Sequence, residues 1–323
     1  MTTFNRRHAL ALFGAATVAG CAPAVQTAAL GDDPFEGGIG GTGIVGVMVG
    51  TGSVLINGLR VEVPDAVRIV DNGGIGGTGA LIPGRAMTIV ARARRDRLEA
   101  LRIDVEDPLV GVLRGDRGAL SVNGTPVTIE PGAVGGTLIG RRVAVSGVWQ
   151  AGGGLRASLI RPADGQPDRV AGTVTGNPAS GWIIGGTSIA PPQGGGLIAG
   201  QYAALSGSFD GTRLTARTLQ LGRFRPGTAL DQLSVEGYLE PIASAPGYRV
   251  AGLGHSFARR LNLAPLVQTR AVFFGRYDGL FAARRAVVVP DTVTGRRALL
   301  TPADGAAFAS ALGGATARRI GNR

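Results

Sequence analysis

Apolar and polar residues alternate along much of this chain, and the alternation predicts β-strands. In residues 87–94 the odd positions are apolar, whereas Thr88, Arg92 and Arg94 fall on the opposite side. A period of two is typical of a strand that buries one face. Turn signals rich in Gly and Asn separate short strands at the spacing of about 8–12 residues that indicates small barrels or sandwiches. The pattern therefore predicts an all-β protein.

A common order of features recurs four times along the chain. Each repeat has a strand containing a glycine, an apolar strand broken by a tight turn, a Gly-rich connection with a Leu-x-x-Gly-like element, and a closing strand that begins Leu-x-Ala. The repeated glycines are spaced by 65, 61 and 65 residues, and they are Gly46, Gly111, Gly172 and Gly237. Composition alone does not place several features in register, so we infer a fourfold duplication.

The repeats predict about four tandem small OB-like β-barrels, followed by a short C-terminal helix. A unit of about 60 residues with five strands fits a reduced barrel, which closes most of its strand edges. The alternative to such a string of barrels is one continuous elongated β-structure in which neighbouring units share strands. The predicted barrels span residues 46–107, 108–168, 169–232 and 233–290.

Residues 291–323 predict the C-terminal helix and a basic tail. Thr301 is in the position of a helix cap, Pro302 is in the first turn, and Gly313 follows the last helical residue. This order of cap, proline and glycine is typical of one short helix, here over residues 303–312.

Residues 1–20 have the three parts of a secretory signal peptide. Arg6 and Arg7 precede an apolar run over residues 9–19, which is too short for a spanning helix of about 20 residues. The run ends in Val-Ala-Gly before Cys21, the only cysteine in the chain. We therefore predict a bacterial lipoprotein signal, with lipid attached to the Cys21 sulfur and residues 21–45 forming a tether. An ordinary signal peptide with a chance cysteine is the alternative.

The predicted lipid places the protein in the bacterial cell envelope. One acyl chain binds a membrane only marginally, whereas two or more anchor it stably. Ala22 in place of an aspartate favours the outer membrane, with either the periplasmic or the surface face displayed. The pair Arg6 and Arg7, followed by Leu10, also resembles a twin-arginine export signal, so that route and the general secretory route both stay open.

Several sequence elements resemble those of a known family. Residues 37–43 read Gly-Gly-Ile-Gly-Gly-Thr-Gly, residues 52–58 contain an Asn-Gly turn, and the Leu-x-x-Gly and Leu-x-Ala elements recur. Together they resemble bacterial lipoproteins that are built from tandem copies of an OB-like domain of unknown function. The resemblance covers roughly residues 37–290 and is weakest in the fourth repeat. It implies OB-like barrels and an envelope location, and it brings no catalytic residues.

The chain is strongly basic. All 33 of its Lys+Arg residues are arginine, against 22 acidic residues, which gives a net charge of +11. Such a charge favours anionic partners. Guanidinium groups bind phosphate and carboxylate well, so the densest arginine cluster is a candidate anion-binding site, although its arginines also fit a solvated surface. This cluster consists of Arg92, Arg94, Arg95, Arg97 and Arg102.

The partners that we expect follow from this charge and from the predicted lipid. They are the membrane, through the N-terminal acyl chains, and an anionic envelope polymer, a lipid or a protein. Aromatic residues make up only 5% of the chain, and the first repeat has no aromatic platform on which bases could stack. This scarcity argues against a nucleic-acid partner.

Two glycine motifs match the spacing of a dinucleotide-binding fingerprint, over residues 38–43 and 74–79. That fingerprint works only when a helix follows, because the helix N-terminus holds the pyrophosphate. β-type sequence follows both copies, so we expect turns here and no cofactor. His255 is the only histidine after the leader, which leaves too few ligands for the usual metal sites, and we expect it at the surface or half-buried.

Asp104 and Glu106 lie two apart in a predicted strand and would point the same way. They could form half of a glycosidase site, which needs two carboxylates across a cleft. Because Ile103 and Val105 alternate with them, we expect both acids on the solvent-facing side instead.

The sequence thus predicts a membrane-anchored, non-enzymatic binding or structural module of the bacterial envelope. An envelope hydrolase with an unrecognised site is one alternative. A binder of nucleic acid or of another anionic polymer, of the OB type, is the second.

Overall fold

The computed structural model describes residues 27–29, 41–94, 97–116, 118–134, 138–243, 247–258 and 266–298. The protein is nearly all β, with 62% strand and 4% helix, and it contains closed five-stranded barrels, extra strands and one short C-terminal helix. The predicted fold class is confirmed. Arg6, Arg7 and Cys21 lie outside the described residues.

The second unit is a closed five-stranded barrel. Around the ring, β9 pairs with β10, β10 with β11, β11 with β13, β13 with β12, and β12 with β9. Only β11 and β13 run parallel, and no edge of the ring is left open. The strands are β9 (Leu109–Asp116), β10 (Ala119–Val122), β11 (Thr125–Val134), β12 (Arg142–Trp149) and β13 (Leu155–Pro162).

The third unit repeats this ring. β14 pairs with β15 and β17, β15 with β16, and β18 with β17, all antiparallel, while β16 and β18 run parallel. The strands are β14 (Asp168–Asn177), β15 (Gly181–Ile184), β16 (Thr187–Ala190), β17 (Tyr202–Phe209) and β18 (Arg213–Leu221).

The first unit makes the same set of pairings and carries an insertion. β2 pairs with β3 and β7, β3 with β4, and β8 with β7 and, in parallel, with β4. The insertion adds β5, which also pairs with β8, then β6 and a short 3-10 helix, η1. The elements are β2 (Gly41–Gly50), β3 (Val54–Ile56), β4 (Leu59–Glu62), β5 (Arg68–Asp71), β6 (Gly74–Ile75), η1 (Thr78–Ala80), β7 (Ala86–Arg94) and β8 (Arg97–Glu106).

The fourth unit has diverged most, as its sequence indicates. β19 pairs with β20 and β22, β20 with β21, and β22 with β23. Within the described residues, no pairing joins β21 to β23, so this ring is open there. The strands are β19 (Leu230–Pro241), β20 (Gly247–Val250), β21 (His255–Ala258), β22 (Arg270–Tyr277) and β23 (Phe281–Val288).

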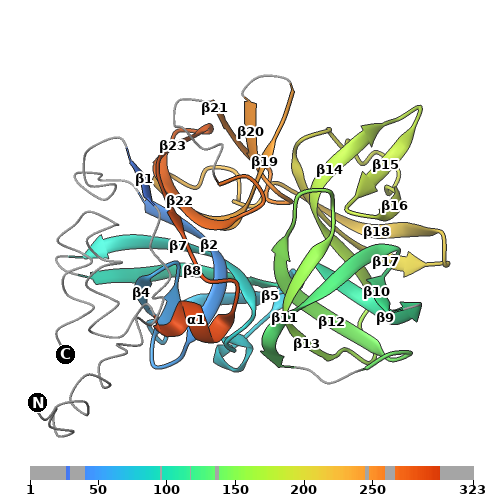
Figure 1. Ribbon diagram of the computed structural model, residues 1–323, viewed down its shortest axis with the longest axis horizontal. Helices are drawn as coiled ribbons and strands as arrows, with labels where there is room; N and C mark the ends of the chain where they lie inside the picture. Colours follow the sequence, from blue (N-terminus) through green and yellow to red (C-terminus); the bar gives the residue numbers. More distant parts are fainter. Residues whose placement is uncertain are drawn as a thin grey trace, which may run out of the picture.

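The four units form a two-by-two block, with the first and fourth units on one side and the second and third on the other (Figure 1). β2 pairs in parallel with β19, and β9 pairs in antiparallel fashion with β14. One buried apolar cluster has members in all four units, including Val47, Trp149, Ile184 and Tyr238. Neither the expected string of barrels nor the elongated alternative describes this block, because strand pairing and a shared core join the units face to face.

The repeated glycine and the Asn-Gly turn have a common structural cause. Asn57 adopts a φ of +54°, in the left-handed region that Asn tolerates. Its side chain turns back and donates hydrogen bonds to the Val45 carbonyl (3.0 Å) and the Ser234 hydroxyl (2.9 Å) of the neighbouring unit. A Cβ on Gly46 would lie 2.2 Å from Asn57 Oδ1. The Asn57 turn is therefore hydrogen-bonded to the first strand of its own unit and to the first strand of the neighbouring unit. The position that faces the Asn57 side chain has to be glycine. Asn123 and Gly111 repeat the arrangement.

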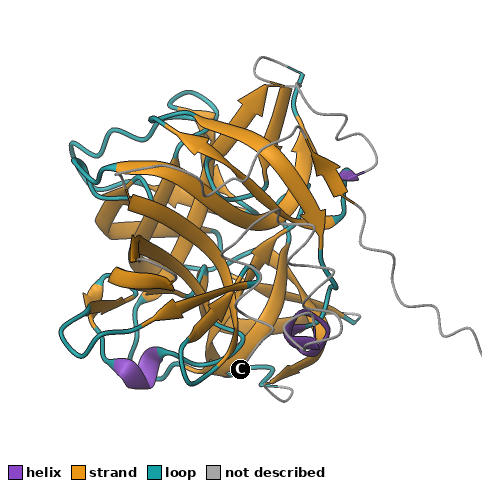
Figure 2. Ribbon diagram, turned by 90° about the vertical axis from the view of Figure 1, so that its left-hand side faces the viewer, coloured by secondary structure: helices purple, strands orange, loops and turns teal. Residues whose placement is uncertain are grey.

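The two ends of the described chain differ from the sequence predictions. β1 (Thr27–Ala29) pairs with β23, and β2 begins at Gly41, so part of the predicted tether is strand. The short helix is α1 (Val293–Ala298), which lies against β2 of the first unit and β11 of the second. Figure 2 draws the few helical residues in purple among the orange strands. The helix predicted over residues 303–312 lies outside the described residues.

Candidate functional site

A cavity of about 510 Å³ opens in the first unit. This volume is within the range of about 300–1,000 Å³ that is usual for ligand pockets. The walls come from the β2–β3 turn, from β4, and from the inserted segment at η1. The cavity therefore lies between the barrel and its insertion.

Apolar side chains form one part of the cavity wall. Met48 and Val54 are buried, at 2% and 1% exposure, and belong to the core of the first barrel. Val63 and Leu81 are half-buried and pack against the same core. These four side chains offer an apolar surface that is supported from behind.

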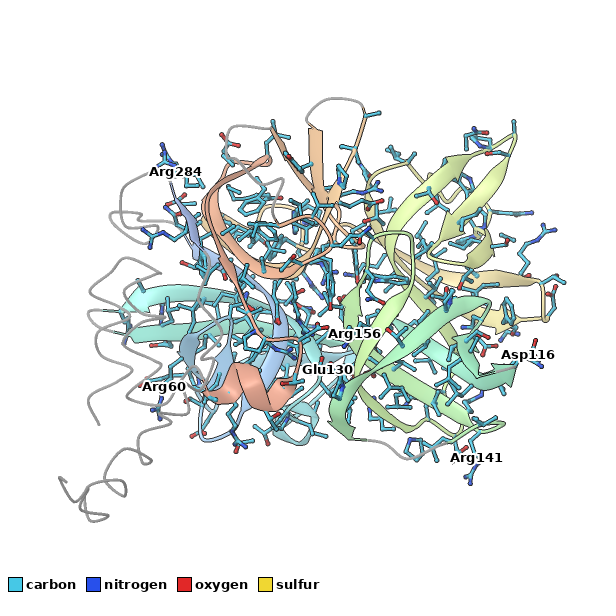
Figure 3. All side chains as sticks on the ribbon, viewed as in Figure 1. Arg60, Asp116, Glu130, Arg141, Arg156 and Arg284 are labelled. Atoms are coloured by element: carbon cyan, nitrogen blue, oxygen red, sulfur yellow. The ribbon has the colours of Figure 1, made fainter. Side chains whose placement is uncertain are left out.

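Polar groups line the rest of the cavity. The β2–β3 turn brings Thr51 and Ser53, and η1 brings Thr78. Arg60 of β4 is exposed, and in the part of the chain that the structure describes it has no ion-pair partner; Figure 3 shows it at the surface. Glu62 also lines the cavity and is already engaged in an interaction. The arrangement presents three hydroxyl groups and one available guanidinium group.

The insertion that completes this cavity is specific to the first unit. The connection between the third and fourth strands of the ring covers residues 63–85 in the first unit. The corresponding connections cover residues 135–141, 191–201 and 259–269. The three other units therefore have shorter connections at this position.

Charged groups fix the base of the insertion to the rest of the molecule. Buried Arg85 donates to both carboxylate oxygens of Asp71, at 2.9 and 2.7 Å, and to Asp107 at 2.6 Å. The Asn72 side chain and the Asp107 backbone and carboxylate exchange two hydrogen bonds of 2.8 Å. Both ends of the segment between Asp71 and Arg85 are held in place as a result.

Asp107 is the centre of this network. Burial alone would raise the pKa of its carboxyl, but the charges of Arg85 and Arg161 outweigh burial and lower the pKa below its ordinary value. Arg161 of β13 donates to Asp107 at 2.6 Å, and Ser146 of β12 donates at 2.5 Å. The network thus joins the first and second units through an ionised carboxylate.

A second buried network joins the second and fourth units and α1. Arg270 donates to Glu236 and to Glu130, each at 2.9 Å, and Arg296 of α1 donates to Glu130 at 3.2 Å. Glu236 also accepts the Val47 backbone N–H at 2.8 Å. Burial would raise the pKa of Glu236, yet the two arginines lower it. Glu130 lies near α1, where the units meet (Figure 3).

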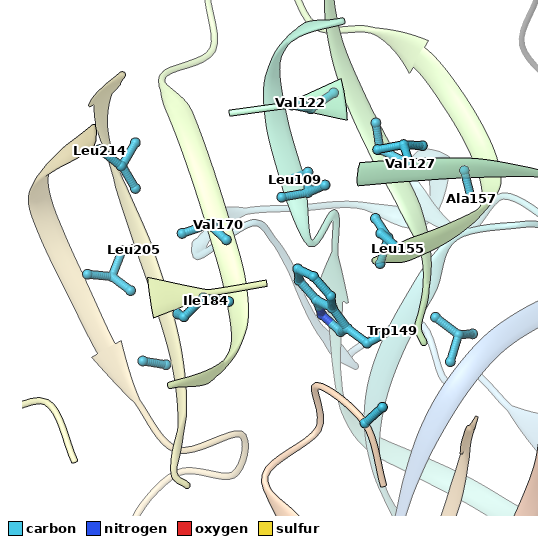
Figure 4. Packing of buried hydrophobic residues seen from close by; sticks show 14 of the residues in the cluster. Leu109, Val122, Val127, Trp149, Leu155, Ala157, Val170, Ile184, Leu205 and Leu214 are labelled. Atoms are coloured by element: carbon cyan, nitrogen blue, oxygen red, sulfur yellow. The ribbon is translucent and has the colours of Figure 1, made fainter. Parts of the chain in front are cut away.

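A smaller cavity of about 180 Å³ lies where the second, third and fourth units meet. Buried Trp149 is part of its wall and donates to the Ala171 carbonyl at 3.0 Å. Figure 4 shows Trp149 between Leu155 of its own barrel and Ile184 of the third. Cβ atoms at Gly185 and Gly252 would lie 2.4 and 2.0 Å from the Trp149 ring, so glycine permits this close packing. The two faces of the Trp149 ring are therefore covered and unavailable for stacking on a ligand.

The described arginines of the predicted cluster pair with two different acidic residues. Arg92 and Arg94 both lie beside Glu99, with N–O distances of 2.6 and 3.5 Å. Arg102 pairs with Asp104, with an Nε–Oδ2 distance of 2.6 Å. Arg95 and the side chain of Arg97 lie outside the described part of the structure.

The two glycine motifs take different structures. The first reaches β2 at Gly41, and the second runs through β6 into η1 (Thr78–Ala80). A three-residue 3-10 helix lacks the row of N-terminal amides that a dinucleotide phosphate needs. The described residues of these motifs thus form strand in the first, and strand, loop and a single 3-10 turn in the second.

Glu106 does not face solvent, and that prediction is wrong. It is 6% exposed and accepts hydrogen bonds from the Tyr202 hydroxyl and from Arg223, both at 2.8 Å. Both partners lie about 100 residues away in the sequence, in the third unit and in the segment that follows it. Their hydrogen bonds compensate the cost of burying the Glu106 carboxylate. Asp104 is half-buried and pairs with Arg102, while Ile103 and Val105 point inward as predicted.

His255 is buried rather than half-buried or at the surface, which corrects a second prediction. It is 7% exposed and lies among the rings of Phe224, Tyr277 and Phe281, with centroid distances of 6.1–6.2 Å. Burial, with a smaller contribution from the charge of Arg223, lowers its pKa to about 3. The imidazole is therefore neutral at physiological pH.

This low pKa makes the fold sensitive to mild acid. In the unfolded chain the pKa of His255 is about 6.5. Between pH 6.5 and 3, therefore, His255 binds a proton in the unfolded state but not in the folded state. Stability should fall through that window by about 1.4 kcal/mol per pH unit. We expect the native chain to lose about 2 kcal/mol more than a His255→Phe variant between pH 7.5 and 5, in urea unfolding at each pH. Equal losses in both proteins would contradict this assignment.

Four cavity residues were not predicted from the sequence: Thr51, Ser53, Arg60 and Thr78. One signal was available, namely the length of the first connection. Leu81 follows Gly46 by 35 residues, whereas Leu138 follows Gly111 by 27. An insertion in one of four repeats points to a feature that the other repeats lack.

Comparison of the chain with protein-family models, with curated proteins and with solved structures finds no match. No helix in the described ranges is both long enough and apolar enough to cross a bilayer. The described residues also contain no group of three or more His, Cys, Asp or Glu placed to hold a metal ion. The candidate site is the cavity of the first unit, with its apolar wall, three hydroxyl groups and Arg60.

Proposed function

We propose that this protein is a lipid-anchored, non-enzymatic binding module of the bacterial envelope, and that the first-unit cavity is its binding site. The anchor is the predicted lipid on Cys21, at the end of a typical lipoprotein signal. The block of four units then holds the cavity in the envelope.

The proposal that this protein binds a ligand rests on one observation. The cavity of about 510 Å³ exists because the first unit has an insertion where the other three have short connections. A supported apolar wall faces three hydroxyl groups and an available guanidinium group. Cavities with mostly apolar walls and a few polar groups are the usual form of small-molecule sites.

The rest of the molecule supports this site as a rigid frame. Buried charge networks centred on Asp107 and Arg270 join units that are distant in sequence. Such pairs resist separation, because removing one partner leaves a buried charge uncompensated. A rigid frame keeps the cavity open in the absence of ligand.

A bulky side chain at the rim tests the binding site. We expect Ser53→Trp to abolish the fluorescence enhancement of 1-anilinonaphthalene-8-sulfonate that the native protein produces, because the indole fills the cavity mouth. Ala119 is exposed at the equivalent position of the second unit, so Ala119→Trp is the matched control and should retain the enhancement. Titration of the dye into each protein gives the comparison. Unchanged dye binding in Ser53→Trp would remove the cavity as the binding site.

A further inference from the structure

We infer that the first-unit cavity binds a small amphipathic anion, with the acidic group at Arg60 and the apolar part covered by residues 72–79, which close as a flap. This inference rests on the proposed function of the cavity as a binding site. Three independent features support it: the charge at the rim, the apolar wall, and the composition of the flap.

Arg60 supplies the charge for the acidic group. It is exposed at the rim and, in the described ranges, forms no ion pair. The hydroxyl groups of Thr51, Ser53 and Thr78 line the same cavity and can donate to an anion. Glu62 is the one acidic residue in the wall, and it already takes part in an interaction. A charge-assisted hydrogen bond to Arg60 would therefore distinguish an anion from a neutral ligand.

The cavity wall also requires an apolar part in the ligand. Met48, Val54, Val63 and Leu81 form a surface backed by the barrel core. A fully hydrated anion such as inorganic phosphate would leave this apolar surface in contact with water. A chain or ring attached to the acidic group would instead remove it from water, which is favourable in proportion to the apolar area covered.

Residues 72–79 form the flap, and they read Asn-Gly-Gly-Ile-Gly-Gly-Thr-Gly. The flap contains β6, which is the last strand at one edge of its sheet. Ile75 is fully exposed, at 101%, and is three residues from Thr78 in the cavity wall. Three residues span at most about 10 Å, so Ile75 lies within reach of the cavity and would cover it in the closed flap.

The glycines of the flap indicate that it adopts a second conformation. Gly77 and Gly79 do not have positive φ, and a Cβ on either would meet nothing within 4 Å. Neither the observed backbone nor its packing requires glycine at these positions. Glycine gives the widest backbone freedom, which a segment that opens and closes needs. The hydrogen bonds of Asp71, Asn72 and Arg85 hold the base of the insertion, and the two-residue pairing of β6 with β5 is what opens when the flap moves.

Three probes with one eight-carbon chain and different head groups test the ligand class: octanoate, octyl phosphate and octanol. Isothermal titration of the full-length protein should show at least one of the two anions binding about tenfold or more tightly than octanol, because a charged hydrogen bond is added. Arg60→Gln should bring that anion to the level of octanol. Arg68 lies in the same unit, is exposed and is outside the cavity wall, so Arg68→Gln is the matched control and should change nothing.

The two anions also separate the sources of such a ligand. Dependence on Arg60 for octanoate alone indicates a fatty-acid-like carboxylate, and dependence for octyl phosphate alone indicates a phosphate monoester. Dependence for both shows that charge rather than head-group geometry is recognised. Each of these results supports an amphipathic anion.

Flap variants test the remaining part of the inference. Ile75→Ser should weaken all three probes by a similar factor of about five to ten, because Ile75 contacts the apolar chain that they share. The double variant Gly77→Ala, Gly79→Ala should keep the native melting temperature and slow probe association in stopped-flow measurements. Unchanged affinity in Ile75→Ser together with unchanged association in the glycine variant would overturn the flap.

The outcomes for the ligand class and for the cavity are distinguishable. Equal binding of octanol and both anions, unaffected by Arg60→Gln but lost in Ser53→Trp, would overturn the ligand class and leave the cavity as the binding site. Binding of every probe that survives Ser53→Trp would overturn the proposed function itself.

Discussion

Replacing Arg270 with leucine should destabilise the protein by about 3–5 kcal/mol. The Arg270 side chain is 1% exposed and compensates the carboxylates of Glu236 and Glu130, whose side chains are 1% and 0% exposed. Burial would lower the pKa of Arg270, but these two carboxylates raise it, so the guanidinium group is charged. Leucine would leave Arg296 alone to balance two buried negative charges. Urea unfolding at pH 7.5 would measure the difference in unfolding free energy.

A surface ion pair of the same unit supplies the control for this prediction. Arg249 pairs with Glu240 at 3.0 Å, with side chains that are 19% and 24% exposed. Both side chains are partly exposed to solvent, which screens the pair to about 0–1 kcal/mol, so Arg249→Leu should have a much smaller effect than Arg270→Leu. If the two variants lost the same stability, the buried network would not be what joins the second and fourth units.

Replacing Cys21 with alanine should release the protein from the membrane fraction. Alanine cannot carry a thioether-linked lipid, and the remaining chain would hold only an electrostatic attraction to anionic lipid. Fractionation of cells that express the native chain and the variant, with and without a high-salt wash, gives the measurement. We expect native protein in the washed membranes and the variant almost entirely in the soluble fraction.

The salt wash is the internal control, because salt screens the attraction between a basic protein and an anionic surface but does not extract acyl chains. Labelling with radioactive palmitate should mark the native chain alone. Retention of Cys21→Ala in salt-washed membranes would show that something other than the lipid anchors the protein.

The strands and the repeats could be predicted because their causes are local. Met87, Ile89 and Ala91 of the alternating segment form one buried face of β7, and the Asn57-Gly58 turn follows from the φ angles that these residues tolerate. Thr88, on the other side of the strand, is also buried, so the alternation indicated the strand but not the burial of both of its faces. The two-by-two packing could not be predicted in the same way. It depends on which first strands pair, β2 with β19 and β9 with β14, and the strand sequences do not specify those partners.

The errors at individual residues have a similar cause. Glu106 has the sequence pattern of an exposed acid, and only Arg223 and Tyr202 from distant segments make its burial tolerable. His255 is likewise buried by aromatic rings from three other segments. The cavity was partly accessible to prediction, because the long connection after β4 is visible in the sequence, whereas the approach of Arg60 and Thr78 to a common space is not.

The parallel pairing of β2 with β19 has a consequence for biosynthesis. A ribosome makes residues 41–45 long before residues 230–235, so this edge of the first barrel stays unpaired until synthesis has reached the fourth unit. An unpaired edge strand is a template for joining another chain. Solenoid arrays tolerate the loss of a terminal repeat, because each repeat contacts only its neighbours. Here a prematurely terminated product would expose the unpaired edge of β2 and associate with other chains, rather than fold as a shorter version of the protein, because the first unit pairs with the last.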